Sequence, residues 1–473
     1  MNNKTVLHYN DNYEEIIELI FSKDSNFFIT GAAGTGKTTL IKKLCIELDL
    51  KSIDYHLVSF TGISSELING NTVHREFFLP VFEQKNINDY LTSITLKKCS
   101  IYRNRYRFLI IDEISFISKK VFEIVNILYQ KINKNTFLFG GLKVIVFGDF
   151  FQLPPVINKE NCFYKDEHGN EEKNGYCFES HLWPQLEFLN IVLKKNFRQS
   201  QDSKFYDILS RCRLGILDKS DIDLLKKRSR EHIDRCEDDL IEKVKGLPII
   251  LIEKIVSHIK YNFNPIYLTS LKNTAKSIND REYLKLDLAT EREYVCIKDI
   301  NYSNCKAKIS TKDANDDLNR FVNALGIDET LKLRIGALVL IKKNNRSNNY
   351  YNGTRGIVIN LFSDKVEIRK TDGNIIILVC EEFKKVLKNG VILIFRQIPL
   401  ILAWALTIHK SQSLTLDSIE VDIGSIFATG QLYVALSRVK KLDCLVLRNS
   451  NDIEKKLFYD KNVENFYNTL NSS

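Results

Sequence analysis

The sequence predicts an α/β protein built from two tandem layers of parallel strands and helices, and three observations indicate this class. An apolar run at residues 26–29 leads into a glycine-rich loop and then a helical segment, in "FITGAAGTGKTTL". The next apolar runs, "YHLVS", "RFLIIDE" and "LKVIVFGD", are continuous rather than alternating, as in parallel strands covered on both faces. A second set of such runs begins at residue 265: "PIYLTS", "ILAWALTIHKS", "SIEVDIGS" and "CLVLRNS".

A small β-rich insertion lies between the two layers. From residue 286 to residue 395 the sequence has strand-like pieces, such as "LRIGALVLIKK" and "TRGIVINLF", and few helical patterns. A chain of 473 residues has room for about two to four domains. We therefore expect a first α/β domain at 1–195 with a small insertion at about 78–107, a second at 196–285 and 396–473, and the β-rich insertion at 286–395.

The composition describes a soluble globular protein inside the cell. Hydrophobic residues make up 44% and charged residues 27% of the chain, and no apolar run is long enough to span a membrane. The ten cysteines have no C-x-x-C spacing, and the N-terminus resembles neither a secretory leader nor a transit peptide. We expect no membrane partner and a location in the nucleus or cytoplasm, or in the host cytoplasm if the chain is viral. The net charge of +9 weakly favours a polyanionic partner.

The loop after the first strand matches the pattern G-x-x-x-x-G-K-[ST] that holds nucleoside triphosphates. Its glycines let backbone N–H groups turn toward the phosphates, Lys37 reaches the outer phosphates, and Thr38 offers a hydroxyl to magnesium. The residues expected to bind the nucleotide are Gly31, Ala32, Ala33, Gly34, Thr35, Gly36, Lys37 and Thr38.

Polar residues follow two other strands of the first layer. In "FLIIDEIS", Asp112 is expected to hold magnesium and Glu113 to polarise the attacking water, because both come where a strand turns toward the loop. In "GDFFQLPPV", Gln152 is expected to sense the γ-phosphate, since an amide can donate to phosphate and accept from water without competing for the metal.

Two arginines far from the loop are candidates for transition-state stabilisation. Arg198 lies in "KKNFRQS", near the junction of the two layers, and Arg438 lies in "YVALSRV", near the end of the second. An arginine brought to the γ-phosphate from a neighbouring domain stabilises the charge that develops there. Taken singly, each is more often a surface residue than such a finger.

In combination these segments resemble the petite-integration-frequency (Pif) family of superfamily 1 DNA helicases. The resemblance rests on segments that occur in the family's order: "GAAGTGKT", "VSFTGISSELINGNTVH", "LIIDEIS", "FGDFFQLPPV", "NFRQS", "LRIGALVLIKKN" with "YYNGTRG", "RQIPLILAWALTIHKSQSLTLDSIEVDIG" and "GQLYVALSRVKKLD". It implies two RecA-like P-loop motor domains with ATP and Mg²⁺ between them, an SH3-like fold for the β-rich insertion, and a strand-separating wedge after residue 74. Lys37, Asp112, Glu113, Gln152, Arg198 and Arg438 would be its catalytic residues.

The resemblance also implies partners and contact residues. A monomer would bind single-stranded DNA and duplex–single-strand junctions, translocate from 5′ to 3′, and work with replication proteins. Two positions depart from the family pattern: no glutamine precedes the loop, where Glu14 stands near the expected place, and Ser413 replaces a glycine. The DNA-contact residues implied by the family blocks are Thr61, Gly62 and His74, and His409, Lys410, Ser411, Gln412 and Thr415.

The sequence therefore predicts an ATP-dependent 5′-to-3′ DNA helicase of replication, repair or recombination. One alternative is a DNA-stimulated P-loop ATPase or nucleic-acid-binding module without processive unwinding. Another is a nucleotide kinase or GTPase, which is disfavoured because the chain has no N-K-x-D signature and such an enzyme would not need the second α/β layer.

Overall fold

A computed structural model describes most of the chain, in two compact units. The described residues are 6–9, 12–60, 68, 70–76, 87, 106–157, 162–166, 168–234, 265–303, 311–343, 345, 350, 352–370, 373–386, 391–412 and 414–471. Thr61, Gly62, Ser413, the side chain of His74 and most of the expected wedge at 78–107 lie outside this description. Unit 1 comprises Met1–Leu217, Ala428–Ser437 and Leu457–Ser473, and unit 2 comprises Asp218–Phe427 and Arg438–Lys456.

Unit 1 contains a seven-stranded sheet in the order β1-β9-β2-β6-β5-β3-β4, in which every pair is parallel. All side chains of β2 and β5 are buried, which explains their continuous apolar sequences. The strands are β1 (Val6–Tyr9), β2 (Phe27–Gly31), β3 (Tyr55–Ser59), β4 (Asn71–Thr72), β5 (Phe108–Asp112), β6 (Lys143–Gly148) and β9 (Leu189–Leu193), with a separate hairpin of β7 (Phe163–Lys165) and β8 (Glu171–Lys173).

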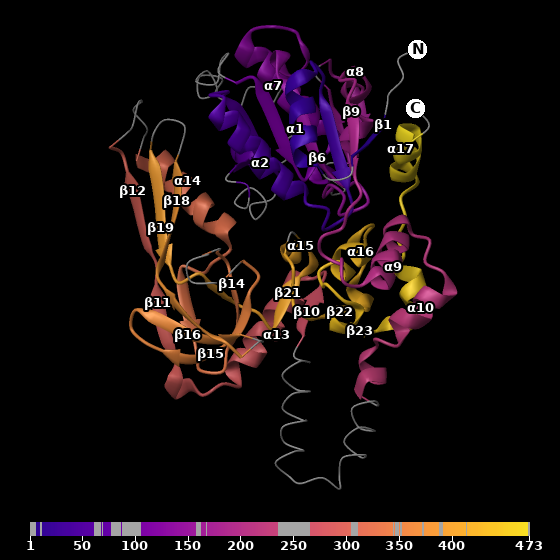
Figure 1. Cartoon of the computed structure of the whole chain (residues 1–473). Coiled ribbons are helices and arrows are strands. Elements are labelled where there is room, and N and C mark those ends of the chain that lie inside the picture. Colours follow the sequence, from indigo (N-terminus) through magenta and orange to yellow (C-terminus); the bar gives the residue numbers. More distant parts are fainter. Residues whose placement is uncertain are drawn as a thin grey trace. The chain divides into compact units, whose positions relative to one another are not determined.

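Helices cover both faces of this sheet (Figure 1). Along β2, Phe27 and Ile29 pack into one core with α1 and α2, whereas Phe28 faces the opposite core with α7 and α17. The helices of unit 1 are α1 (Tyr13–Ser22), α2 (Lys37–Leu50), α4 (Val73–Glu76), α7 (Lys119–Asn133), α8 (Leu182–Gln185), α9 (Ser203–Leu214), α16 (Gln431–Leu436) and α17 (Lys461–Asn471).

Unit 2 contains a second parallel sheet in the order β21-β10-β22-β23. Its strands fall within the four apolar runs expected from the sequence, so the α/β class with two parallel layers is confirmed. The strands are β10 (Ile266–Thr269), β21 (Ala405–Thr407), β22 (Ile419–Asp422) and β23 (Leu445–Arg448), and the helices are α10 (Lys219–Lys226), α13 (Lys272–Leu284) and α15 (Ile408–Ser411).

The rest of unit 2 is largely antiparallel sheet. A five-stranded sheet runs β17-β16-β15-β14-β20, a three-stranded sheet runs β12-β19-β18, and β11 pairs with β13. The strands are β11 (Arg292–Val295), β12 (Ile297–Asn301), β13 (Thr330–Leu333), β14 (Leu338–Ile341), β15 (Arg355–Leu361), β16 (Lys365–Lys370), β17 (Ile375–Val379), β18 (Glu381–Val386), β19 (Ile392–Gln397) and β20 (Leu400–Leu402).

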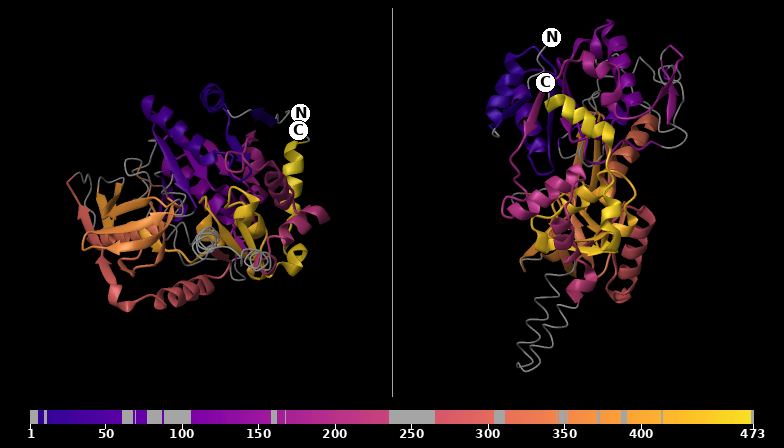
Figure 2. Two further views of the ribbon diagram at one scale, coloured as in Figure 1. Left: turned by 60° about the horizontal axis from the view of Figure 1, so that its bottom comes forward. Right: turned by 90° about the vertical axis from the view of Figure 1, so that its right-hand side faces the viewer.

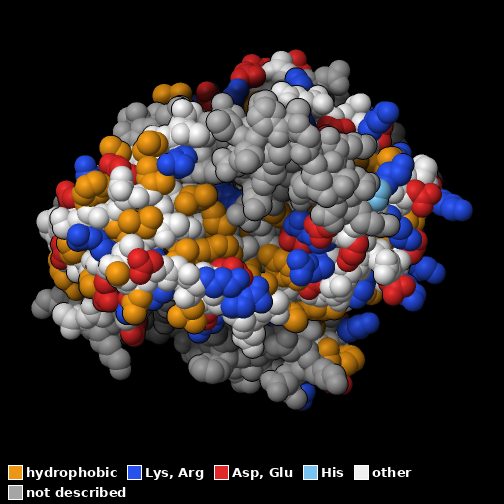
Figure 3. All heavy atoms as spheres, turned by 90° about the horizontal axis from the view of Figure 1, so that it is seen from below, with side chains coloured by type: hydrophobic (Ala, Val, Ile, Leu, Met, Phe, Trp, Pro, Cys, Tyr) orange, Lys and Arg blue, Asp and Glu red, His pale blue; other side chains and the backbone are white. Residues whose placement is uncertain are grey.

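A helix interrupts this β-rich region. α14 (Thr311–Leu325) packs Leu318, Phe321 and Val322 into one core with Phe395 of β19. On β17, exposed Ile375, Ile377 and Val379 alternate with buried residues. Figure 3 shows hydrophobic side chains among mixed charges on the face seen from below. No helix in the described part of the chain is long and apolar enough to cross a membrane.

The compact units divide the chain differently from the sequence-based domain boundaries. From the sequence, all of 396–473 is expected in the second α/β domain, whereas 428–437 and 457–473 group with unit 1. The cause is packing, because Phe466 and Tyr467 of α17 lie against the core of the first sheet. Figure 2 shows α17 from two further sides.

Arg355, the first residue of β15, is a buried cation with two guanidinium nitrogens that lack a hydrogen-bond partner among the described residues. Its side chain is 4% exposed, and neither Nε nor Nη2 has a hydrogen-bond partner in the structure, so far as it is described. Burial lowers the pKa of Arg355 to about 10, against the opposing influence of Asp417. An unpaired buried charge destabilises a fold.

We therefore predict that Arg355→Met raises the melting temperature by a few degrees, because it removes a charge and keeps the apolar bulk. Thermal unfolding followed by circular dichroism measures the change. The pKa of Arg355 in the folded protein lies below the usual arginine value. The destabilisation of the fold by its charge is therefore fully present below about pH 10 and decreases as the pH rises above that value. Arg334→Met is the matched control: this buried arginine is paired with Glu291 at 2.8 Å, so its loss should lower the melting temperature. A fall for both variants would contradict the prediction.

Candidate active site

The loop between β2 and α2 forms a tight turn against the start of α1. Gly36, which precedes α2, has φ of 85°, in the left-handed region that favours glycine. A Cβ at Gly36 would lie 2.0 Å from the Tyr13 hydroxyl, so a larger residue cannot replace it without displacing Tyr13. Glu14, near the place of the missing glutamine, instead points to solvent and pairs with Lys43 at 2.6 Å.

Lys37 folds back onto this loop. Its Nζ donates to the carbonyl oxygens of Gly31 at 2.5 Å and Ala32 at 3.0 Å. Desolvation lowers the pKa of Lys37, while the charges of Asp149 and Glu113 act in the opposite direction. An ammonium held among carbonyls in a glycine-rich turn fits a polyanionic ligand such as a triphosphate.

Asp112 and Glu113 lie at the end of β5, as the sequence predicted. The Glu113 N–H donates to Asp112 Oδ1 at 2.9 Å, and Glu113 adopts a left-handed φ of 53°, which is uncommon outside glycine. Both side chains are buried, and burial, followed by the charge of Glu113, raises the pKa of Asp112. Lys37 counters that shift. A divalent cation would stabilise the ionised form of such a carboxyl, so Asp112 fits a magnesium ligand.

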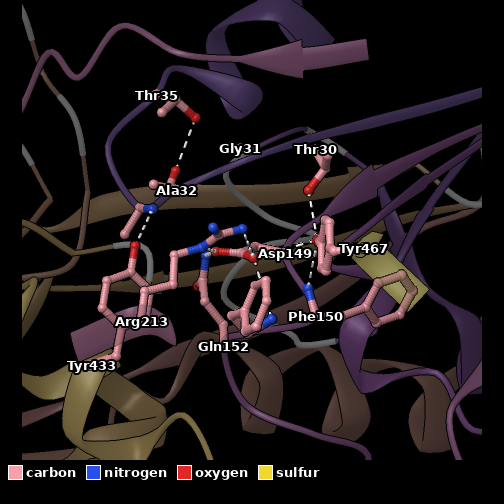
Figure 4. Close-up of polar contacts among 12 residues, drawn as sticks. Thr30, Gly31, Ala32, Thr35, Asp149, Phe150, Gln152, Arg213, Tyr433 and Tyr467 are labelled. Carbon is pink, nitrogen blue, oxygen red and sulfur yellow. Dashed lines mark hydrogen bonds and ion pairs between the residues drawn. The ribbon is translucent and has the colours of Figure 1, made fainter. Parts of the chain in front are cut away.

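Gln152 is held by an ion pair that the sequence did not reveal, between fully buried Asp149 and mostly buried Arg213 (Figure 4). Gln152 Nε2 donates to Asp149 Oδ2 at 3.3 Å. Arg213 of α9 donates to the same carboxylate from Nε at 2.9 Å and from Nη2 at 2.6 Å. Although burial opposes the shift, the guanidinium of Arg213 lowers the pKa of Asp149, so the pair stays ionised. Asp149 lies in the same "GDFFQ" segment as Gln152, whereas no local signal indicated Arg213.

The two residues before Arg198 are hydrogen-bonded to the loop and so hold Arg198 close to it. The Phe197 N–H donates to Gly34 O at 3.0 Å, and Asn196 Nδ2 donates to Ala33 O at 2.8 Å. Arg198 Nη1 donates to Ser437 O at 2.9 Å. Burial lowers the pKa of Arg198 to about 10, which still leaves the guanidinium charged at neutral pH.

α16 contributes contacts that sequence analysis missed. The Tyr433 hydroxyl accepts the Ala33 N–H at 2.7 Å, so α16 touches the loop directly (Figure 4). Gly430, which precedes this helix, lies against the "GDFFQ" segment: a Cβ there would be 2.2 Å from Gln152 O. The close approach requires glycine at this position.

Arg438 and the second implied DNA-contact block lie together in unit 2. Arg438 is buried and donates from Nη1 to Ser411 O at 3.3 Å, while its own carbonyl accepts the Leu416 N–H at 2.9 Å. His409 and Lys410 are exposed, whereas Ser411 and Gln412 are buried. The role of Arg438 at a phosphate stays a prediction, as do the contacts of this block with DNA.

The loop, the two carboxylates, Gln152 and Arg198 therefore lie in unit 1, at the carboxyl ends of parallel strands or packed against the loop. This arrangement defines a P-loop nucleoside triphosphatase with a RecA-like α/β sheet.

Comparison with known proteins identifies the family within this class. The model of the family described as "PIF1-like helicase" matches residues 8–222. The ATP-dependent DNA helicase Pif1 of Bdellovibrio bacteriovorus is 30% identical over 443 residues, which cover 93% of this chain and 88% of that protein. The crystal structure of Bacteroides sp. Pif1 in complex with ADP-AlF4 matches with a TM-score of 0.72 at 25% identity, and covers 98% of this chain and 97% of that one. Bacteroides Pif1 bound to ssDNA matches over the same shares with a TM-score of 0.59 at 25% identity.

The chain belongs to the PIF1-like helicase family. The resemblance drawn from the sequence segments and the expected fold class are both confirmed.

The ion pair between Asp149 and Arg213 gives a testable expectation for stability. Asp149→Asn removes the charge that compensates Arg213, whose side chain is 17% exposed, so we expect the free energy of unfolding to fall by about 3 kcal/mol, the lower end of the range for a broken buried pair. Urea denaturation followed by circular dichroism measures this. As a control, Glu454→Gln removes the exposed partner of Lys226 and should leave the transition unchanged. Equal, small effects of both changes would show that the buried pair contributes little.

Proposed function

We propose that this chain is an ATP-dependent DNA helicase that moves from 5′ to 3′ along single-stranded DNA and unwinds duplex. The observation that carries the proposal is the convergence of the P-loop, Asp112, Glu113, Gln152 and Arg198 in unit 1. Relatives across nearly the full length of the chain are named ATP-dependent DNA helicases, which supports DNA as the polymer on which hydrolysis acts.

In this proposal each residue of unit 1 has a defined task toward ATP. Lys37 and the turned loop amides bind the outer phosphates, and Thr38 and Asp112 would hold Mg²⁺. When bound, the ion neutralises charge on the phosphates. Glu113 orients the attacking water and accepts its proton, and Gln152 donates to the γ-phosphate from the side chain that Asp149 holds. Arg198 stabilises the charge that develops on the transferred phosphoryl group.

DNA contacts belong to two blocks in this proposal. The structure of Bacteroides Pif1 bound to ssDNA supports a single-strand partner for this chain. Exposed His409 and Lys410 suit contacts to the phosphate backbone, which need no base recognition. We further propose that the chain acts as a monomer at duplex–single-strand junctions, in contact with replication proteins, in the nucleus or cytoplasm. The residues assigned to DNA are Thr61, Gly62, His74, His409, Lys410, Ser411, Gln412 and Thr415.

Strand displacement on matched duplexes tests the function and its polarity. With ATP and magnesium, we expect unwinding of a duplex with a 5′ single-stranded tail and none of a duplex with a 3′ tail. Lys37→Ala is the control and should unwind neither, because it removes the ammonium that binds the phosphates. Unwinding only from the 3′ tail would overturn the polarity. DNA-stimulated hydrolysis without displacement would support the alternative of a P-loop ATPase that does not unwind.

Arg198→Ala tests the proposed finger. We expect kcat for ssDNA-stimulated ATP hydrolysis to fall about 10³-fold, because an arginine at the γ-phosphate acts mainly in the transition state. Lys194→Ala, an exposed cation of the same segment, should keep the kcat of the unchanged chain and so controls for charge. If Arg198→Ala kept a kcat within about twofold of that of the unchanged chain, Arg198 would not be a finger. Its role would then be the structural hydrogen bond to Ser437 O.

A further inference from the structure

We propose that Tyr467, on the C-terminal helix α17, is a positioning residue of the nucleotide site whose hydroxyl fixes the P-loop strand relative to the segment that carries Gln152. The proposal rests on the ATP hydrolysis of the proposed function. α17 follows all the sequence segments that resemble the family, and we infer that it nevertheless influences the rate of hydrolysis.

α17 is anchored in the core of unit 1. The ring of Phe466 stacks on Phe178, with centroids 4.4 Å apart and planes at 15°, and lies 5.4 Å from Phe150. Val463 and Leu470, on the same helix, are buried in the same core. This packing fixes α17 on the core, so Tyr467, which follows Phe466, is also held in a fixed position.

The Tyr467 hydroxyl sits between two segments of the site (Figure 4). It lies 2.8 Å from Thr30 Oγ1, accepts the Phe150 N–H at 3.2 Å, and donates to Asp149 Oδ1 at 3.5 Å. One donor and two acceptor sites are all that a phenolic hydroxyl has. With Thr30 as donor, every one of them is used.

The hydrogen bonds of the Tyr467 hydroxyl link β2 and β6 just beyond the last pair of residues that the two strands share. Thr30 and Gly148 form the last pair between β2 and β6. After this pair the chains separate, one into the P-loop at Gly31 and the other toward Gln152. The Tyr467 hydroxyl bonds both at the point of separation, so it sets the distance between the groups that hold the phosphates and the amide that senses them. Displacements of about 1 Å in such groups cost up to about a hundredfold in rate.

The ring of Tyr467 has a separate packing role. It stacks on Phe151 with centroids 4.7 Å apart and planes at 17°, and the guanidinium of Arg213 lies 5.5 Å from its centroid. A phenylalanine at this position keeps the ring and loses only the hydroxyl. Tyr467→Phe therefore isolates the bridge from the stacking.

The test compares steady-state ATP hydrolysis with saturating ssDNA for the full chain and its Tyr467→Phe variant. We expect kcat to fall about tenfold with KM for ATP within about threefold of the starting value, because the change misaligns groups that act in the transition state. Tyr164→Phe is the matched control: this tyrosine is also buried in unit 1 and donates to Glu123 at 2.5 Å. We expect Tyr164→Phe to lower the melting temperature about as much as Tyr467→Phe does, but to keep the kcat of the unchanged chain.

Thr30→Val gives an independent measurement if Tyr467→Phe does not fold. Each single change should lower kcat, and the double variant should be no slower than the slower single variant, since both break the same bridge. The proposal is overturned if Tyr467→Phe and Thr30→Val keep the starting kcat, or if Tyr164→Phe loses as much. Failure of the unchanged chain to hydrolyse ATP would instead refute the proposed function.

Discussion

The ion pair between fully buried Asp149 and mostly buried Arg213 is the interaction on which the nucleotide site depends. Two charges removed from water are tolerated only when their attraction and their other hydrogen bonds compensate for the lost hydration. Here the Asp149 carboxylate also accepts hydrogen bonds from the Phe151 N–H at 3.2 Å and from the Gln152 amide at 3.3 Å, so the pair also holds the segment that carries Gln152. The guanidinium is covered by the Phe151 ring, 4.4 Å away. The carboxylate of Asp149 therefore both balances the charge of Arg213 and fixes the side chain of Gln152.

Much of the fold could be predicted because its information is local. Continuous apolar runs identified the parallel strands of both units, and the loop pattern placed Lys37 between a strand and a helix. Asp112 and Glu113 were found for the same reason, since a strand end is visible in the sequence. α14 was missed because its apolar face consists of few residues in a polar segment, and it is stabilised by packing on β19.

The rest of the site could not be predicted because its partners are distant in the sequence. Tyr433 meets Ala33, and Tyr467 meets Thr30, through packing of helices that follow the β-rich region. Nothing in the residues around either tyrosine distinguishes it from an ordinary core aromatic. Arg213 likewise occupies a helix whose sequence gives only an amphipathic pattern. Such residues are identified by the contacts that the tertiary structure makes.

The division of the chain between the two units has a consequence for biosynthesis. The backbone passes from one unit to the other at 217/218, 427/428, 437/438 and 456/457, so two segments of unit 1 follow residues 218–427 of unit 2 in the sequence. On the ribosome the first sheet can form early, whereas α16 reaches it only after residues 218–427 of unit 2 have been synthesised, and α17 only after residues 438–456 as well. A chain interrupted before residue 428 would carry β2 and the P-loop without Tyr467, which contacts Thr30, and without Tyr433, which contacts Ala33. Nucleotide turnover that needs these contacts would therefore begin only after both helices had been synthesised.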